Sequence, residues 1–145
     1  MWRSLVFALT CLILAGCSNQ PGNNSSAQSG DALDVYEAVF RYRLQKYPAD
    51  VRAYLAVDGQ DVSEELLGRL RRDWPNLKPA SEEPKEKGLR VYVEKLKWVN
   101  RSTAELHAGW WSPSKFAGDG YSGDHRVVRD GRQWRVEKVT NEIMS

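Results

Sequence analysis

Cysteine and histidine are scarce in this sequence, with two of each in 145 residues. Cys11 lies within an apolar N-terminal segment, and Cys17 lies shortly after it. Beyond Cys17 no thiol remains, which excludes a disulfide framework, a cysteine-based metal site and a cysteine nucleophile from the rest of the chain. The two histidines lack a metal-ligand spacing, which argues against zinc. We therefore predict no metal and no cofactor.

Catalytic and nucleic-acid-binding signatures are also missing. The sequence contains no phosphate-binding Walker loop, no Gly-x-Ser-x-Gly and no dinucleotide fingerprint. Its formal net charge is +2, whereas a nucleic-acid-binding protein shows a concentrated basic surface. We therefore predict no catalytic residue from a motif and no nucleic-acid partner.

One apolar run stands out, and it is short. Residues 5–14 read LVFALTCLIL and follow Arg3. A helix needs about 20 apolar residues to cross a bilayer core, so this run is too short to span one. A positive charge, a short apolar run and small residues before a cleavage site are typical of a secretory signal. We predict that residues 1–16 are a signal peptide that is removed.

The end of this segment resembles the lipobox of bacterial lipoproteins. The family pattern of Leu, a small residue, Gly or Ala, and Cys is matched by Leu14, Ala15, Gly16 and Cys17. The resemblance implies cleavage before Cys17 and acylation of its thiol and its new amino group. Ser18, rather than an aspartate, follows the cysteine, which favours the outer membrane. The predicted location is therefore the bacterial envelope, lipid-anchored at the outer membrane and facing the periplasm.

A polar segment separates this cysteine from the rest of the chain. Residues 18–30 read SNQPGNNSSAQSG and contain no large apolar side chain. Such a segment cannot bury enough surface to offset its ordering entropy. We predict a lipidated cysteine and flexible tether over 17–30, and a single domain over 31–145.

Apolar periodicity predicts two helices and then several strands in the domain. The second helix is expected to begin with a capping box formed by Asp61 and Glu64, and the Asp130-Gly131 pair predicts a hairpin turn. A β-bulge is expected near Glu94 and Lys95, because the apolar alternation changes phase there. The expected segments are helices at 33–47 and 61–74, a polar loop at 78–88, and strands at 51–57, 89–98, 103–111, 126–129 and 133–139.

This element order predicts an α+β domain, with two N-terminal helices packed on a curved antiparallel sheet of four to five strands. It resembles the nuclear transport factor 2-like and cystatin-like folds. The resemblance rests on the segments VYEAVFRYRL, LRVYVEKLKWVN and HRVVRDGRQWRVEKV. It implies a fold that hosts enzymes, ligand carriers and interaction modules alike, so it does not decide the function.

Two acid–base candidates share one face of a predicted strand. Glu105 and His107 are two residues apart, which places both side chains on the polar face. One interpretation is a pair of exposed cross-strand partners. The other is a catalytic pair, which would require perturbed pKa values in a cleft.

Aromatic residues provide the second candidate site. Trp110 and Trp111 are neighbours on a predicted strand and must point to opposite faces. If Trp110 joins the core, Trp111 is either covered by Phe116 or Tyr121 or exposed. An exposed Trp111 beside Lys115 and Phe116 would suit a ligand or partner. The candidate contact region therefore comprises Trp111, Lys115, Phe116 and Tyr121.

These observations favour a membrane-anchored envelope lipoprotein with a non-enzymatic binding domain. Its expected partners are the membrane, through the lipid on Cys17, and an envelope protein or a small ligand. The alternative is a small-molecule enzyme of the isomerase, dehydratase or hydrolase type, with its pocket between the helices and the sheet.

Overall fold

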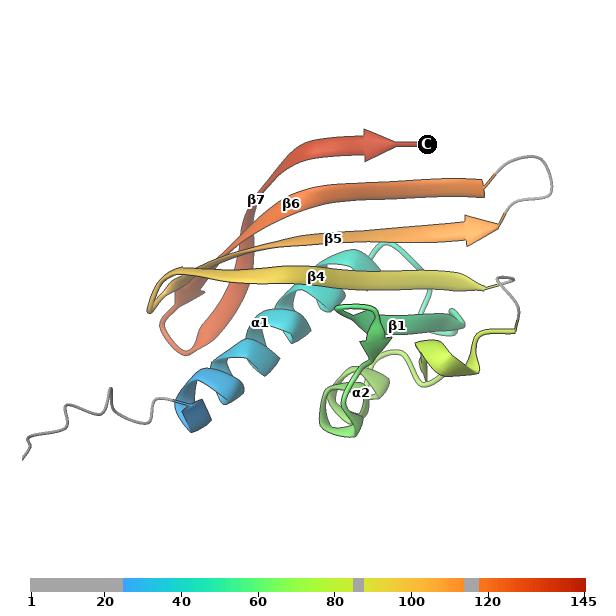
Figure 1. Ribbon diagram of the computed structural model, residues 1–145. Helices are drawn as coiled ribbons and strands as arrows, with labels where there is room; N and C mark the ends of the chain where they lie inside the picture. Colours follow the sequence, from blue (N-terminus) through green and yellow to red (C-terminus); the bar gives the residue numbers. More distant parts are fainter. Residues whose placement is uncertain (1–24, 85–87, 114–117) are drawn as a thin grey trace, which may run out of the picture.

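The computed structural model describes residues 25–84, 88–113 and 118–145. Two α-helices, one 3-10 helix and seven strands make up the described part of the chain (Figure 1). In chain order the elements are α1 (Ser25–Leu44), β1 (Ala53–Val57), β2 (Gln60–Asp61), α2 (Glu64–Arg71), β3 (Lys78–Pro79), η1 (Ala80–Glu82), β4 (Leu89–Asn100), β5 (Thr103–Pro113), β6 (Gly118–Asp130) and β7 (Gln133–Met144).

The strands form one mixed sheet of seven strands, so the predicted fold class is wrong. The order is β2-β1-β4-β5-β6-β7, with β3 paired to β1. The pairs β4–β5, β5–β6 and β6–β7 are antiparallel, but β1 runs parallel to both β3 and β4. Parallel neighbours need a long crossover, and the chain that includes α2 provides it between β1 and β4. The segment expected to be a polar loop supplies β3 and η1.

Helix α1 is longer than its apolar pattern predicts. It begins at Ser25, within the segment expected to be a tether, and its last residue is Leu44. Val35, Val39 and Phe40 are fully buried on one side of this helix. Pro48 follows shortly after the helix, as expected from its missing amide donor.

Helix α2 begins with a different cap from the one expected. The Ser63 hydroxyl accepts a hydrogen bond from the Leu66 amide at 3.2 Å, so Ser63 is the N-cap. The Asp61 carboxylate instead accepts from the Ser81 amide at 2.7 Å. Asp61 thus joins β2 to η1, and the capping box predicted at Asp61 and Glu64 is wrong.

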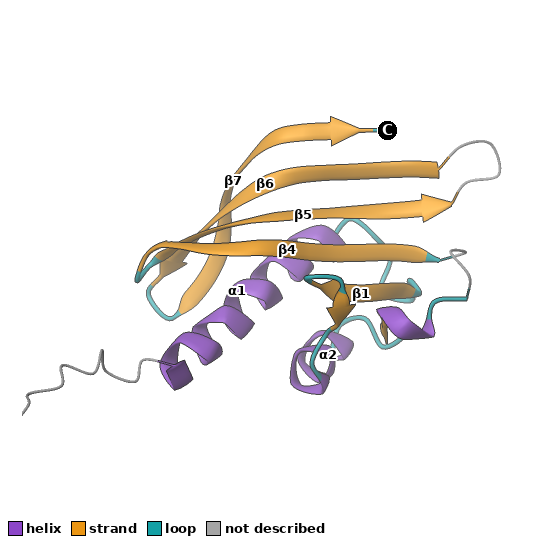
Figure 2. Ribbon diagram, in the orientation of Figure 1, coloured by secondary structure: helices purple, strands orange, loops and turns teal. Residues whose placement is uncertain are grey.

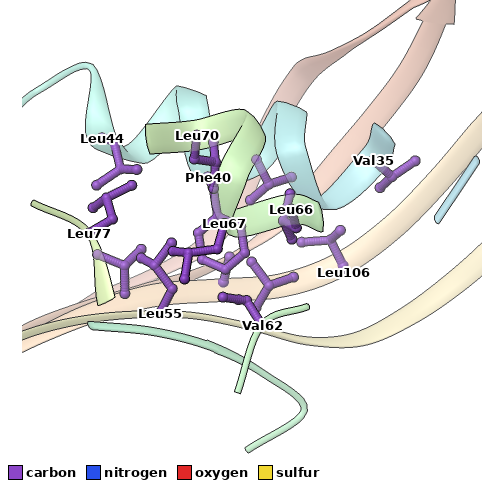
Figure 3. Close-up of a cluster of buried hydrophobic side chains, with 14 of the residues drawn as sticks. Val35, Phe40, Leu44, Leu55, Val62, Leu66, Leu67, Leu70, Leu77 and Leu106 are labelled. Carbon is purple, nitrogen blue, oxygen red and sulfur yellow. The ribbon is translucent and has the colours of Figure 1, made fainter. Parts of the chain in front are cut away.

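The core lies between the two helices and the sheet. Figure 3 shows side chains of α1 and α2, including Phe40, Leu66 and Leu67, meeting above Leu55 and Leu106 of the sheet. These five side chains are at most 3% exposed. Burial of each such side chain contributes roughly 1.5–3 kcal/mol to folding. The interface between helices and sheet is therefore filled with apolar side chains.

The sheet has an inner face, which α1 covers, and an outer face (Figure 2). On the inner face, Val91 of β4, Leu106 of β5 and His125 of β6 are buried. On the outer face, Tyr92 and His107 are half-buried. None of the helices in the described segments is long and apolar enough to cross a membrane.

Irregular pairing changes which side chains reach the outer face. The β4–β5 register shifts between Glu94 and Lys97, which confirms the bulge predicted near Glu94 and Lys95. The β6–β7 register shifts between Ser122 and Asp124, and again between Arg126 and Val127. The hairpin predicted at Asp130-Gly131 also forms, with Gly131 at a φ of 61°. Bulges bend a strand and re-aim its side chains.

Candidate functional site

The predicted contact residues are divided between the two faces of the sheet. Trp111 is half-buried on the outer face, opposite Arg90 of β4. Tyr121 pairs with Trp110 and therefore lies on the inner face. Cys17, Lys115 and Phe116 lie outside the described residues. The structure therefore places Trp111 apart from Tyr121.

Trp111 lines a pocket of about 350 Å³ on the outer face. Strand β4 contributes Arg90, Tyr92 and Glu94, and the β1 side contributes Ala56 and Gly59. We call this pocket the aromatic pocket. It has the two features that ligand sites combine, namely apolar rings and a few polar groups that can fix an orientation. Its volume lies at the small end of the range for ligand sites.

Tyr92 is held in place across the face of the sheet. Its hydroxyl lies against Gly109 of β5, where a methyl group would come within 2.6 Å of the oxygen. The same hydroxyl forms a hydrogen bond with Ser122 of β6, and burial raises its pKa. Tyr92 therefore spans three strands and forms a fixed wall of the aromatic pocket.

Arg90 is the cation of the aromatic pocket, and Glu83 orients it. The Arg90 Nε donates to Glu83 Oε2 at 2.7 Å, and a guanidinium nitrogen contacts the same oxygen. The Glu83 side chain is only 2% exposed, and its Oε1 has no hydrogen-bond partner in the described residues. Because an ionised carboxylate is costly to bury alone, this pairing fixes the Arg90 guanidinium at the pocket wall.

Glu105 and His107 line a second cavity, of about 430 Å³, on the same face. The His107 Nδ1 lies 2.9 Å from Asp124 Oδ1, and the Asn141 amide donates to Asp124 Oδ2 at 2.7 Å. These two hydrogen bonds lower the pKa of Asp124, Asn141 having the larger effect. Glu105 accepts from Arg126 at 3.0 Å. We call this space the bulge cavity, because the register shifts of β4 and β7 surround it.

The two acid–base candidates therefore have different environments. Glu105 forms a cross-strand ion pair with Arg126, and its side chain is 46% exposed. His107 is oriented by Asp124, which itself is fixed by Asn141. Since Nδ1 is occupied, Nε2 is the ring atom that a ligand could reach. The Tyr92 ring lies 6.4 Å from the His107 ring and so links the bulge cavity to the aromatic pocket.

Sequence reasoning missed a polar cluster on the inner face. Arg43 of α1 is only 2% exposed, and its guanidinium contacts the Nε2 of His125, which is fully buried. The His125 Nδ1 lies 2.9 Å from the Gly123 carbonyl, to which it donates. Desolvation and the Arg43 charge lower the pKa of His125 to about 4. Both ring nitrogens are occupied, so His125 is a neutral structural residue.

Aromatic rings surround the buried guanidinium. The Arg43 guanidinium carbon lies 4.1 Å from the centre of the Tyr121 ring and 5.4 Å from that of Tyr42. Such cation–π contacts are strongest when the cation is desolvated. The only sequence signal for this cluster was the position of Arg43 next to Leu44 on the apolar side of a helix.

Comparisons with known proteins do not assign the chain to a family. No family model matches the sequence, and no curated protein matches it. The sugar N-methyltransferase KedS8 from a Streptoalloteichus species aligns with 99% of this chain and 83% of its own, at 8% identity and a TM-score of 0.28. A similarity at this level leaves the function unassigned. Within the described ranges, no three metal-ligating side chains gather as a metal site would require.

Proposed function

We propose that this protein is a lipid-anchored envelope lipoprotein whose domain binds a partner or a small ligand on the outer face of its sheet. The observation that carries the binding role is the aromatic pocket, in which Trp111 and Tyr92 adjoin the fixed guanidinium of Arg90. The anchoring role rests on the lipobox resemblance at Cys17 and on the polar segment that follows it.

The geometry favours binding over catalysis in the aromatic pocket. Its charged groups are Arg90 and Glu94, and the Arg90 guanidinium is already paired with Glu83. Tyr92 is held by Ser122, with a pKa raised above its usual value. None of these groups adjoins a histidine or a second acid in the pocket lining that could activate it as a nucleophile. Two rings beside a fixed cation instead match the composition of binding hot spots.

The contact role is tested by replacing Trp111. Trp111→Ala removes the largest ring of the pocket, whereas Trp111→Phe retains an aromatic surface. We expect Trp111→Ala to lose envelope partners captured by cross-linking in intact cells, and Trp111→Phe to keep most of them. Ile143→Ala is the matched control, because Ile143 is 63% exposed and lines neither cavity. An identical set of partners and bound small molecules in the wild type and Trp111→Ala would refute the contact role.

The anchor is tested separately with Cys17→Ser. The wild type should incorporate radiolabelled palmitate and sediment with membranes, because acylation provides the attachment. Cys17→Ser should incorporate none and should be released when the envelope is opened. Retention of Cys17→Ser in the lipid fraction would count against acylation without affecting the result for Trp111.

One observation keeps the enzyme alternative as a second candidate. His107 and Asp124 form an oriented pair in the bulge cavity, which is the arrangement that a general base requires. This pair is on the outer face, whereas the alternative placed its pocket between the helices and the sheet. There the structure has buried apolar side chains, together with Arg43 and His125. An enzyme of this chain would therefore act at the bulge cavity.

A further inference from the structure

The bulge cavity is built by irregularities in two strands that converge from either side. On β4, the extra residue in the register shift places Lys97 on the same face as Glu94, although the two are three residues apart, and Lys97 lines the cavity together with Lys95. On β7, the shift opposite Ser122 and Asp124 brings Asn141 to the Asp124 carboxylate. Bulges beside functional sites re-aim side chains in this way.

Backbone strain is concentrated at the same place. In the described part of the chain, three non-glycine residues have a positive φ, and two of them line the bulge cavity: Lys95 at 60° and Asn141 at 52°. Asparagine tolerates this region, but for lysine it is unusual. Strained residues persist where the surroundings enforce them, and they cluster at ligand sites. The positive φ of Lys95 is held by a hydrogen bond that its backbone amide donates to Asp58 Oδ1 at 2.9 Å.

The acidic side chains of the bulge cavity pair with residues other than its lysines. The carboxylate of Glu105 is paired with Arg126, and that of Asp124 with His107 and Asn141. Lys95, Lys97 and Lys138 line the same cavity and form no ion pair with any residue in the described ranges. Three lysines from two strands thus line a space in which both acids already have partners.

We propose that the bulge cavity binds a phosphorylated ligand. The phosphate group would lie among Lys95, Lys97 and Lys138, and would accept a hydrogen bond from Nε2 of His107 in its imidazolium form, because the proton on Nδ1 is donated to Asp124. Lysine is a standard phosphate-binding residue, acting as a point charge with three donors. A cavity of about 430 Å³ has room for a phosphate ester rather than for the ion alone. This site is distinct from the aromatic pocket, so it goes beyond the proposed function.

The test uses the full chain extracted in uncharged detergent. Calorimetric titration with glucose 6-phosphate probes a soluble phosphorylated molecule, and mixed micelles containing phosphatidic acid probe a lipid headgroup. Glucose and diacylglycerol, which are the two probes without their phosphate group, are the controls. Binding of either phosphorylated probe supports the proposal, and the probe that binds identifies the source. Absence of binding by both, at millimolar soluble probe, would overturn it.

Matched triple variants locate the binding. Replacing Lys95, Lys97 and Lys138 by glutamine should weaken binding about tenfold or more, because charge-assisted hydrogen bonds are lost. The control replaces Arg52, Arg101 and Arg132 by glutamine, which gives the same change of charge at exposed positions outside the cavity. An equal loss in both triple variants would indicate attraction by net charge and would overturn the proposed site.

Lys95→Asn separates function from structure. Asparagine suits the positive φ at this position, so we expect Tm to rise by roughly 2–4 °C while the phosphorylated probe binds several-fold more weakly. A residue with a purely structural role would not show this opposition between stability and binding. Retention of wild-type affinity by Lys95→Asn would refute the role assigned to Lys95. Trp111→Ala should leave this binding unchanged, so the two proposals can fail independently.

Discussion

Arg43 is a buried cation whose neighbours are rings and an imidazole, with no carboxylate of the described residues paired to it. Its Nε has no hydrogen-bond partner in those residues. Burying a charge in this way is costly unless the surroundings stabilise it. The Tyr121 ring and the neutral His125 provide that stabilisation, and a protonated His125 would remove part of it.

The His125 contact therefore predicts a pH dependence of stability. His125 has a folded-state pKa of about 4, below its ordinary value of 6.5. Between these values the unfolded chain binds a proton that the folded chain does not, so the free energy of unfolding falls as the pH falls from 6.5 towards 4. Over this pH range the free energy of unfolding falls by on the order of 3 kcal/mol. Urea unfolding of the wild type across this range should show the slope, and His125→Gln should flatten it. An unchanged slope in His125→Gln would assign the effect to other groups.

Two glycines allow a matched test of local packing. A methyl group on Gly109 would lie 2.2 Å from the Tyr121 carbonyl oxygen and 2.6 Å from the Tyr92 hydroxyl. A methyl group on Gly68, in α2, would meet nothing within 4 Å. We expect Gly109→Ala to lose on the order of 2 kcal/mol of unfolding free energy, and Gly68→Ala to gain about 0.5–1 kcal/mol. Thermal unfolding of both variants measures this difference in stability. A Gly109→Ala variant as stable as the wild type would contradict the close packing described at Gly109.

At the scale of elements, local signals were the most informative. The Asp130-Gly131 turn and the phase change near Glu94 depend only on neighbouring residues, and both features formed where they were predicted. The parallel pairing of β1 with β4 joins segments that are distant in the sequence, through a crossover that includes α2, and no local pattern encodes it. That long-range choice is the reason why an antiparallel sheet was expected and a mixed one was found.

The candidate site shows the same limit. Alternation along β5 correctly separated Trp110 from Trp111, because successive side chains on a strand point to opposite faces. It could not place Tyr121, since a shift of one residue in the β5–β6 register would move Tyr121 to the other face. The bulge cavity was likewise hidden, because it requires two irregular strands and the pairing of Asp124 with His107.

Helix α2 offers a test of an element boundary. Ser63→Ala removes the acceptor for the Leu66 amide and should cost about 1 kcal/mol of unfolding free energy. Ser63→Asp supplies another acceptor and a favourable charge at the helix N-terminus, so it should retain wild-type stability. Chemical denaturation of the two variants checks the assignment. If Asp61→Ala lowered the free energy of unfolding more than Ser63→Ala did, the N-cap would have to be assigned to Asp61 instead of Ser63.

At the scale of the molecule, the two ends of the domain have different surroundings if Cys17 is acylated. Helix α1 begins at the end where Asp31 forms an ion pair with Arg129, and Arg129 donates its amide to the Ser102 carbonyl at 2.8 Å. Along β5 from Thr103 to Trp111, the strand rise gives about 26 Å to the aromatic pocket. The anchored end should therefore lie near the bilayer, and the aromatic pocket should face away from it.

Site-specific photocrosslinking in membranes tests this orientation. A photoreactive side chain in place of Arg101, in the β4–β5 turn, should form adducts with phospholipid. The same group in place of Gln60, exposed on β2 beside Gly59 of the aromatic pocket, should form few lipid adducts and should capture a binding partner instead. Cys17→Ser in the same background should reduce the lipid adducts at position 101, because anchoring holds that end at the membrane surface. Equal lipid labelling at both positions would mean that the domain has no preferred orientation, and the outer face would then be as accessible to lipid as to a soluble ligand.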